Sequence, residues 1–138
     1  MLFKIKIMKK FILATFALLA LLSCRNDDEL DIEPLVGDWT WVSTSGGING
    51  QINDTPTSTG KTIILSLKDD DTYTFTTNGT VTNQGTFKLY KDVSNLDHIE
   101  RTYIDFSSTG HQMIRSNDET NLYLSDDAND GVESHYKK

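Results

Sequence analysis

From Leu35 onward the chain lacks the 3.6-residue apolar spacing of an amphipathic helix. It has instead short runs rich in Thr, Tyr, Phe, Ile and Val, divided by Gly, Asn and Asp, which is the pattern of strands joined by turns. Eight such runs are counted: 36–45, 61–67, 72–77, 80–90, 102–108, 111–116, 121–126 and 132–137. Eight short strands with tight connections predict one all-β domain over 35–138, an eight-stranded antiparallel up-and-down barrel.

The clearest turn of this domain is Asn78-Gly79, because Asn-Gly between alternating strands is the strongest short hairpin signal. A two-residue loop would split the odd-numbered apolar residues of the two strands between two faces. A three-residue loop over 77–79, with Gly79 in the left-handed conformation, keeps them on one face. These residues are Tyr73, Phe75, Val81, Phe87 and Leu89. We therefore predict the three-residue loop; the other register would need a repairing bulge near Gly85.

Two polar segments flank the first predicted strand. Arg25–Pro34 combines little apolar content with a run of acidic residues, which predicts a disordered tether reaching roughly 30 Å. The segment 46–60 is rich in Gly, Asn, Thr and Ser and joins the first two strands. A connection of this length in a small domain is either functional or disordered.

The first 23 residues have a different character. Four lysines precede the apolar run Phe11–Leu22, which is typical of a secretory signal and is too short to span a bilayer comfortably. Translation could start at Met1 or Met8. Cys24 follows the run and is the only cysteine, so it has no disulfide partner within the chain in an oxidising compartment.

The stretch Leu21-Leu22-Ser23-Cys24 resembles the lipobox of bacterial lipoproteins. The resemblance implies cleavage before Cys24, acyl chains on its sulfur and new amino group, and stable anchoring to the outer membrane. The alternative is an ordinary secreted protein with a stray cysteine. Asp27-Asp28-Glu29 resembles the acidic export signal of Bacteroidetes surface lipoproteins, which implies an outward-facing protein; a spacer on the periplasmic side is the alternative.

The charge of the chain limits its partners. The whole chain carries −7, and removal of residues 1–23, with their four lysines and no acidic residue, leaves −11 on 115 residues. A strongly acidic surface excludes nucleic acid and a polybasic hold on anionic lipid as expected partners. It is compatible with cationic partners or with none.

The opening strand contains Gly37-Asp38-Trp39, and the block from Tyr73 to Phe87 contains further shared residues. Together with the eight-strand pattern, these residues resemble the lipocalins, and more closely the short lipocalin-like domains of Bacteroidetes lipoproteins. The resemblance implies that Trp39 closes the bottom of the barrel, that Gly37 is structural with it, and that 46–60 arches over the mouth. Lys137 or Arg115 would replace the late arginine that packs on the tryptophan. No helix follows the last predicted strand.

A barrel of this kind predicts a ligand cavity lined by inward aromatic residues. The candidates are Trp41, Tyr73, Phe75, Phe87, Phe106 and Met113. The ligand would be a small apolar molecule or a glycan fragment. The alternative is that these side chains fill a small barrel, which would then serve as a structural or protein-interaction lipoprotein.

Neither catalysis nor a cofactor is expected. His98, His111 and His135 are scattered over a loop and two strands, with no nucleophile elbow, phosphate loop or metal-ligand spacing. Asp126–Gly131 resembles a calcium loop only loosely, because Ala128 stands at a ligand position. We expect this segment and Asp69–Asp71 to be turns.

Overall fold

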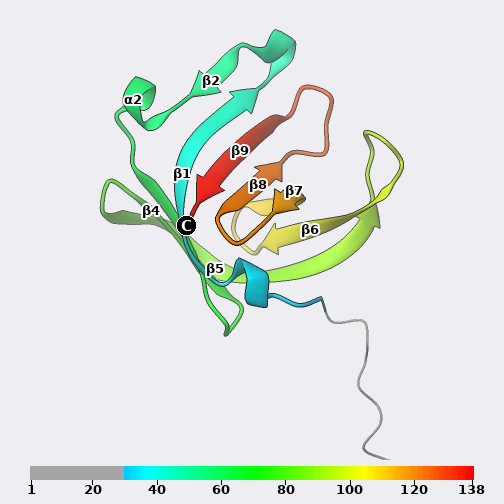
Figure 1. Ribbon diagram of the computed structural model, residues 1–138, viewed down its shortest axis with the longest axis horizontal. Helices are drawn as coiled ribbons and strands as arrows, with labels where there is room; N and C mark the ends of the chain where they lie inside the picture. The colour runs from blue at the N-terminus through cyan, green and yellow to red at the C-terminus, as the bar shows by residue number, and fades with distance from the viewer. Residues whose placement is uncertain (1–29) are drawn as a thin grey trace, which may run out of the picture.

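The computed structural model describes residues 30–138, so the expected signal peptide, Cys24 and the Asp27–Glu29 run lie outside the described part. Within that part, nine strands form one antiparallel sheet. Strand β1 pairs with β3 on one side and with β9 on the other, which closes the sheet into a ring (Figure 1). None of the described helices is long and apolar enough to cross a membrane.

The elements are short apart from β1 and β5. The strands are β1 (Gly37–Gly46), β2 (Ile52–Asp54), β3 (Ile63–Leu67), β4 (Thr72–Thr77), β5 (Thr80–Val93), β6 (Glu100–Phe106), β7 (Gly110–Asn117), β8 (Asn121–Ser125) and β9 (Val132–Lys137). The helical pieces are η2 (Glu33–Leu35), η3 (Ile48–Gly50) and α2 (Pro56–Thr59). Each of the eight predicted runs overlaps one of these strands, and β2 is the strand that the sequence pattern missed.

The segment 46–60 is built differently from the expectation. It contains η3, β2 and α2, and β2 pairs with the last residues of β1 beyond the end of β3. Thr55 and Ser58 cap α2 reciprocally, because each backbone N–H bonds the other hydroxyl, and Gly60 ends the helix with φ +68°. The segment therefore flanks β1 as a structured addition to the ring.

The predicted three-residue hairpin loop is wrong. Thr77 pairs with Thr80, so the loop has two residues, Asn78 and Gly79, both with positive φ. The register then shifts between Phe75 and Thr76, because Thr82 is inserted as a bulge. The bulge returns β5 to the interior register but leaves Val81 exposed on the other face. A bulge does repair the two-residue register, three residues earlier than the expected position near Gly85.

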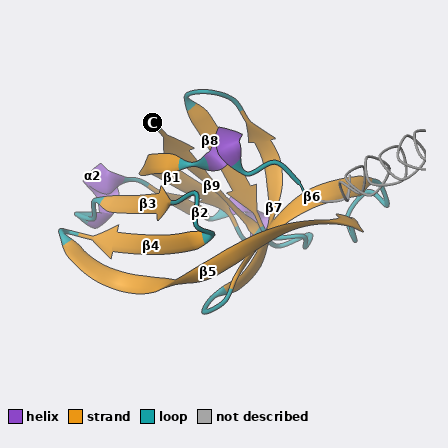
Figure 2. Cartoon of the chain, turned by 90° about the horizontal axis from the view of Figure 1, so that it is seen from below, coloured by secondary structure: helices purple, strands orange, loops and turns teal. Residues whose placement is uncertain are grey.

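Strand β5 carries the sheet around a corner of the ring. Its first half, through Thr86, pairs with β4, and its second half, from Phe87, pairs with β6. Figure 2 shows β5 continuing past β4 toward β6. The last three residues of β5, 91–93, and the first three of β6, 100–102, form a two-stranded arm, because β6 pairs with β7 only from Tyr103 onward.

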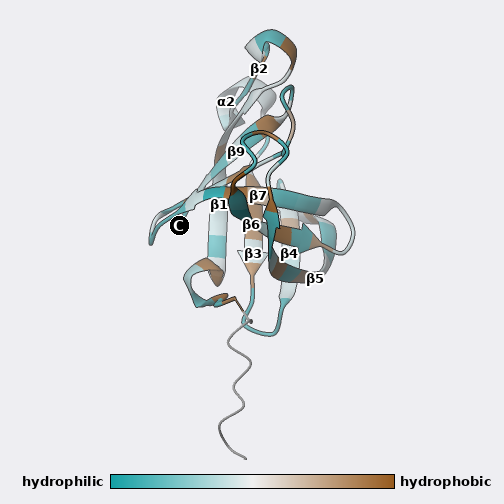
Figure 3. Cartoon of the chain, turned by 90° about the vertical axis from the view of Figure 1, so that its right-hand side faces the viewer, coloured by the Kyte–Doolittle hydropathy of each residue, from teal (hydrophilic) through white to brown (hydrophobic). Residues whose placement is uncertain are grey.

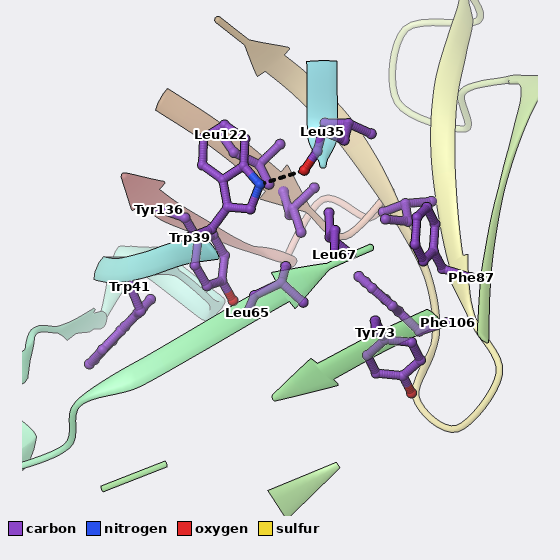
Figure 4. Packing of buried hydrophobic residues seen from close by; sticks show 12 residues of the cluster. Leu35, Trp39, Trp41, Leu65, Leu67, Tyr73, Phe87, Phe106, Leu122 and Tyr136 are labelled. Carbon is purple, nitrogen blue, oxygen red and sulfur yellow. Dashed lines mark hydrogen bonds between the residues drawn. The ribbon is translucent and has the colours of Figure 1, made fainter. Parts of the chain in front are cut away.

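The interior of the ring is filled by apolar side chains from the strands and from η2 (Figure 4). Leu35 of η2 is 3% exposed, and Ile32 packs against the same cluster. The expectation of a disordered tether is therefore wrong for residues 32–34, which belong to the folded domain. Twelve residues form the buried cluster: Leu35, Trp39, Trp41, Leu65, Leu67, Tyr73, Phe87, Ile104, Phe106, Leu122, Leu124 and Tyr136.

Candidate functional site

Five of the six predicted ligand-lining residues belong to the interior cluster or pack against it, and three of them contact one another. The Tyr73 and Phe106 rings lie 4.7 Å apart, and the Phe75 and Phe106 rings 5.5 Å apart, both in edge-to-face geometry. Trp41, Tyr73, Phe87 and Phe106 are each at most 4% exposed. Figure 4 shows Tyr73, Phe87 and Phe106 on one side of the cluster and Trp41 on the other, with Trp39 and Leu65 between them. This arrangement is a packed core, which was the alternative to a ligand cavity.

Met113 is buried on the other face of the sheet. It pairs with Tyr103, whereas Ile104, the strand neighbour of Tyr103, belongs to the interior cluster. Adjacent residues of a strand point to opposite faces, so Met113 and Tyr103 share the outer face. The prediction that Met113 lines the interior is wrong.

Trp39 contacts residues from both ends of the domain. Its side chain is fully buried, and its Nε1–H donates to the Leu35 carbonyl at 2.7 Å. The Lys138 ammonium lies 4.5 Å from the centre of the Trp39 ring. The cation that covers the tryptophan is therefore Lys138, and neither Lys137 nor Arg115 takes this position; Arg115 instead pairs with Glu133.

The space accessible to small molecules lies outside this core. An open groove of about 310 Å³ runs beside η2, where β6 and β7 separate. It is lined by Leu30, Pro34, Leu35, Leu89 and Ile114 together with polar residues that include Arg115. A shallower pocket of about 450 Å³ lies over β4 and β5 and includes Tyr73. Neither hollow brings together more than one of the six predicted ligand residues.

The histidines take no catalytic arrangement with one another. His111 meets the edges of the Tyr90 and Tyr103 rings, and His135 stacks on Tyr123 at 4.3 Å. Burial lowers the pKa of His135. His135 Nε2 also lies 2.9 Å from the side-chain oxygen of Asn121, within hydrogen-bonding distance. Both contacts are typical of a histidine that packs on a sheet surface.

Asp126–Gly131 and Asp69–Asp71 are turns, as expected. The Asp126 carboxylate accepts the Val132 backbone N–H at 3.1 Å. Asp70 similarly accepts from Thr72. These carboxylates hold their own turns, and among residues 30–138 no three His, Cys, Asp or Glu residues are grouped to hold a metal ion.

Asp127 is the centre of a polar cluster that the sequence analysis missed. Its carboxylate accepts from the Ser94 hydroxyl at 2.7 Å, from the Asn95 backbone N–H at 2.8 Å and from the Tyr103 hydroxyl at 2.9 Å. These bonds, led by that from the Asn95 backbone, lower the pKa of Asp127 to about 2. Burial, reinforced by Asp127, raises the pKa of Tyr103 to about 12. No local motif indicates this cluster, because the residues that bond Asp127 lie 24 to 33 positions before it in the sequence.

Comparison with known proteins adds no assignment to this geometry. No protein-family model, no curated protein and no solved structure matches the chain.

Proposed function

We propose that the chain is an envelope lipoprotein whose β domain is a non-catalytic protein-interaction module. The filled interior carries this proposal. Four of the aromatic side chains that would line a ligand cavity are at most 4% exposed in this packed core, which supports binding at the outside of the ring. The scattered histidines and the carboxylates held in turns give no support to catalysis.

The proposed anchor is acyl chains on Cys24 in the outer membrane. Its support is the sequence of the leader and the lipobox-like stretch before Cys24. Treatment with globomycin should make an unprocessed precursor accumulate, and Cys24→Ala should release or misprocess the protein. An unchanged product in both experiments would reject the anchor. Protease shaving of intact cells would separate an outward from a periplasmic orientation.

We further propose that the domain is a lipocalin-like barrel to which β2 has been added. The support is the sequential antiparallel order of β1 and β3–β9, which are eight strands closed by the β1–β9 pairing. Gly37 and Trp39 on the opening strand, with a cation on the Trp39 ring, add to it.

The test of the interaction module is native mass spectrometry of the full chain after gentle detergent extraction. We expect the mass of the processed, acylated protein without a co-purified small molecule. A stoichiometric apolar or glycan adduct would reject the proposal in favour of a small-molecule binding module. The groove beside η2 favours that second function, because it is apolar on several sides and large enough for a small ligand.

A further inference from the structure

We propose that one end of the ring is the docking surface for a protein partner that presents apolar sites on either side of a basic centre. This distal surface consists of three connections, Gly47–Ile52, Val93–Ile99 and Asp126–Gly131. The inference rests on the proposed interaction function and names the surface and partner chemistry for it.

Exposed apolar side chains are concentrated at the distal surface. Six large apolar residues among residues 30–138 are strongly exposed, and five of them lie here. They are Ile48 (67%), Ile52 (38%), Val93 (57%), Leu96 (37%) and Ile99 (54%). The sixth, Val81, lies on the β4–β5 hairpin. Clustered exposed apolar residues on loops are typical of an interaction site, whereas a single one such as Val81 needs no explanation.

The three connections are physically joined to one another. Gly131 in the β8–β9 connection accepts the Gly47 backbone N–H at 3.1 Å. At the other end of the same connection, Asp127 binds Ser94 and Asn95 of the β5–β6 connection. The exposed apolar residues thus form two groups, Ile48 with Ile52 and Val93 with Leu96 and Ile99. The β8–β9 connection lies between these two groups and is hydrogen-bonded to the segment that carries each of them.

The contacts around Asp127 also fix the position of the β5–β6 tip. Ser94 is 1% exposed, and its hydroxyl accepts the Leu96 backbone N–H at 3.1 Å while donating to Asp127. The Tyr103 hydroxyl donates to the same carboxylate, and the Tyr103 ring stacks on Tyr90. A tip that is already ordered loses less entropy when it binds, which favours recognition by this surface.

The charge between the two apolar groups is negative. Asp126 and Asp130 lie on the β8–β9 connection, and neither has an ion-pair partner among the described residues, whereas Asp97 and Glu100 are paired with Arg101 and Lys91. This charge opposes anionic lipid and opposes the same surface of a second copy. It attracts a basic patch, so the complementary partner is a protein with a basic centre and apolar flanks.

The distal surface lies at the end of the ring opposite η2, which follows the proposed membrane anchor in the chain. Figures 1 and 3 place η2 at the opposite end of the ring from these connections, and Figure 3 shows apolar colour on the loops at that far end. The proposed anchor precedes η2 in the chain. The distal surface would therefore face away from the membrane that holds the protein.

The test is site-specific photocrosslinking of the full chain in its native cells. A photoreactive amino acid is placed at Leu96, at Ile48 and, as a matched exposed control, at Val81. We expect one and the same protein adduct from positions 96 and 48 and none from 81. The adduct protein is then purified, and its binding to the detergent-extracted chain is measured at low and high salt.

We expect Leu96→Asp and Ile48→Asp each to weaken this binding by about tenfold or more, and added salt to weaken it further. Val81→Asp should leave it unchanged, and unchanged melting temperatures would show that the variants fold. An adduct with a second copy or with lipid, or equal crosslinking from Val81, would overturn the proposal. An adduct from Val81 alone would reject this surface but keep the interaction function. No adduct from any position, with a bound small molecule in the native mass spectrum, would reject both.

Discussion

At the scale of single residues, Trp39 joins parts of the domain that are far apart in the sequence. Its indole donates to Leu35, and its ring lies under the Lys138 ammonium. Gly37 has φ +135°, and a Cβ at this position would lie 2.9 Å from the Lys138 Cε. The glycine two residues before the tryptophan therefore leaves room for the cation that covers it.

Gly37→Ala should lower the free energy of unfolding by about 1 kcal/mol or more, because alanine is strained at positive φ and would displace Lys138. Urea denaturation of the soluble Cys24→Ala chain would measure this loss. In a Lys138→Ala background the part caused by the clash should disappear, while the backbone strain remains. Equal losses of unfolding free energy in both backgrounds would show that the position of the Lys138 side chain over Trp39 does not require glycine at position 37.

Three of the five tyrosines, Tyr90, Tyr103 and Tyr136, have a raised pKa, and the last two should ionise latest. Burial raises the pKa of Tyr103 and of Tyr136 to about 12, above the ordinary value near 10. The unfolded chain then loses these protons first, so stability should fall as the pH rises from about 10 toward 12. Spectrophotometric titration should show the late phase, and Tyr103→Phe should reduce it. Ionisation of all tyrosines near pH 10 in the folded protein would contradict these environments.

At the scale of elements, the β4–β5 hairpin shows what residue patterns could and could not predict. Asn78-Gly79 predicted the turn because both positions need positive φ. The parity of apolar residues predicted the wrong loop, because counting odd and even positions assumes a strand without a bulge. The bulge at Thr82 costs little where Val81 can face solvent, and no side chain of the strand signals it in advance.

Deletion of Thr82 should therefore be tolerated. It is the residue of β5 without a cross-strand partner, so its removal leaves the pairs of the hairpin in place, and only its exposed hydroxyl contacts are lost. We expect a loss below about 1 kcal/mol in urea denaturation. Deletion of Thr86 is the matched control, because it would turn Phe87 out of the interior. Similar losses from the two deletions would contradict the observed register.

The connection between β5 and β6 should loosen when Asp127 is replaced. In Asp127→Asn the Asn95 backbone N–H loses its charged acceptor, so its hydrogen exchange should accelerate, while the amides of β3 and β4 exchange as before. Because the pKa of Asp127 is lowered, its contribution to stability is present above about pH 4 and is lost as the pH falls toward 2. Asp127→Asn should therefore not show this loss of unfolding free energy between about pH 4 and pH 2. Asp130→Asn, on the same connection, is the control and should change neither property.

At the scale of the whole molecule, the alternation of apolar residues predicted eight of the nine strands and most of the inward side chains, with Val81 and Met113 as the exceptions. It could not predict whether the ring is hollow. That depends on how side chains from seven strands and η2 fill a shared volume, as the membership of the buried cluster shows. The sequence could not predict the distal surface either, because its apolar residues come from connections that only the closed ring brings together.

The folded domain begins before the first strand, because residues that precede β1 pack on the core inside the ring. The composition of Arg25–Pro34 placed the domain boundary at Leu35, but composition does not register the contacts of Ile32 and Leu35 with the distant strands of the core.

A chain that begins at Leu30 should therefore unfold at the same urea concentration as the Cys24→Ala chain. A chain that begins at Gly37 loses the buried Leu35 side chain, worth roughly 1.5–3 kcal/mol, and leaves the Trp39 indole without its acceptor at a further cost of about 1 kcal/mol. The Leu35→Ala variant separates the two effects, since it keeps the acceptor carbonyl and removes the side chain. Equal stability of the Leu30 and Gly37 chains would mean that η2 does not stabilise the ring and that the domain begins where the strand pattern begins.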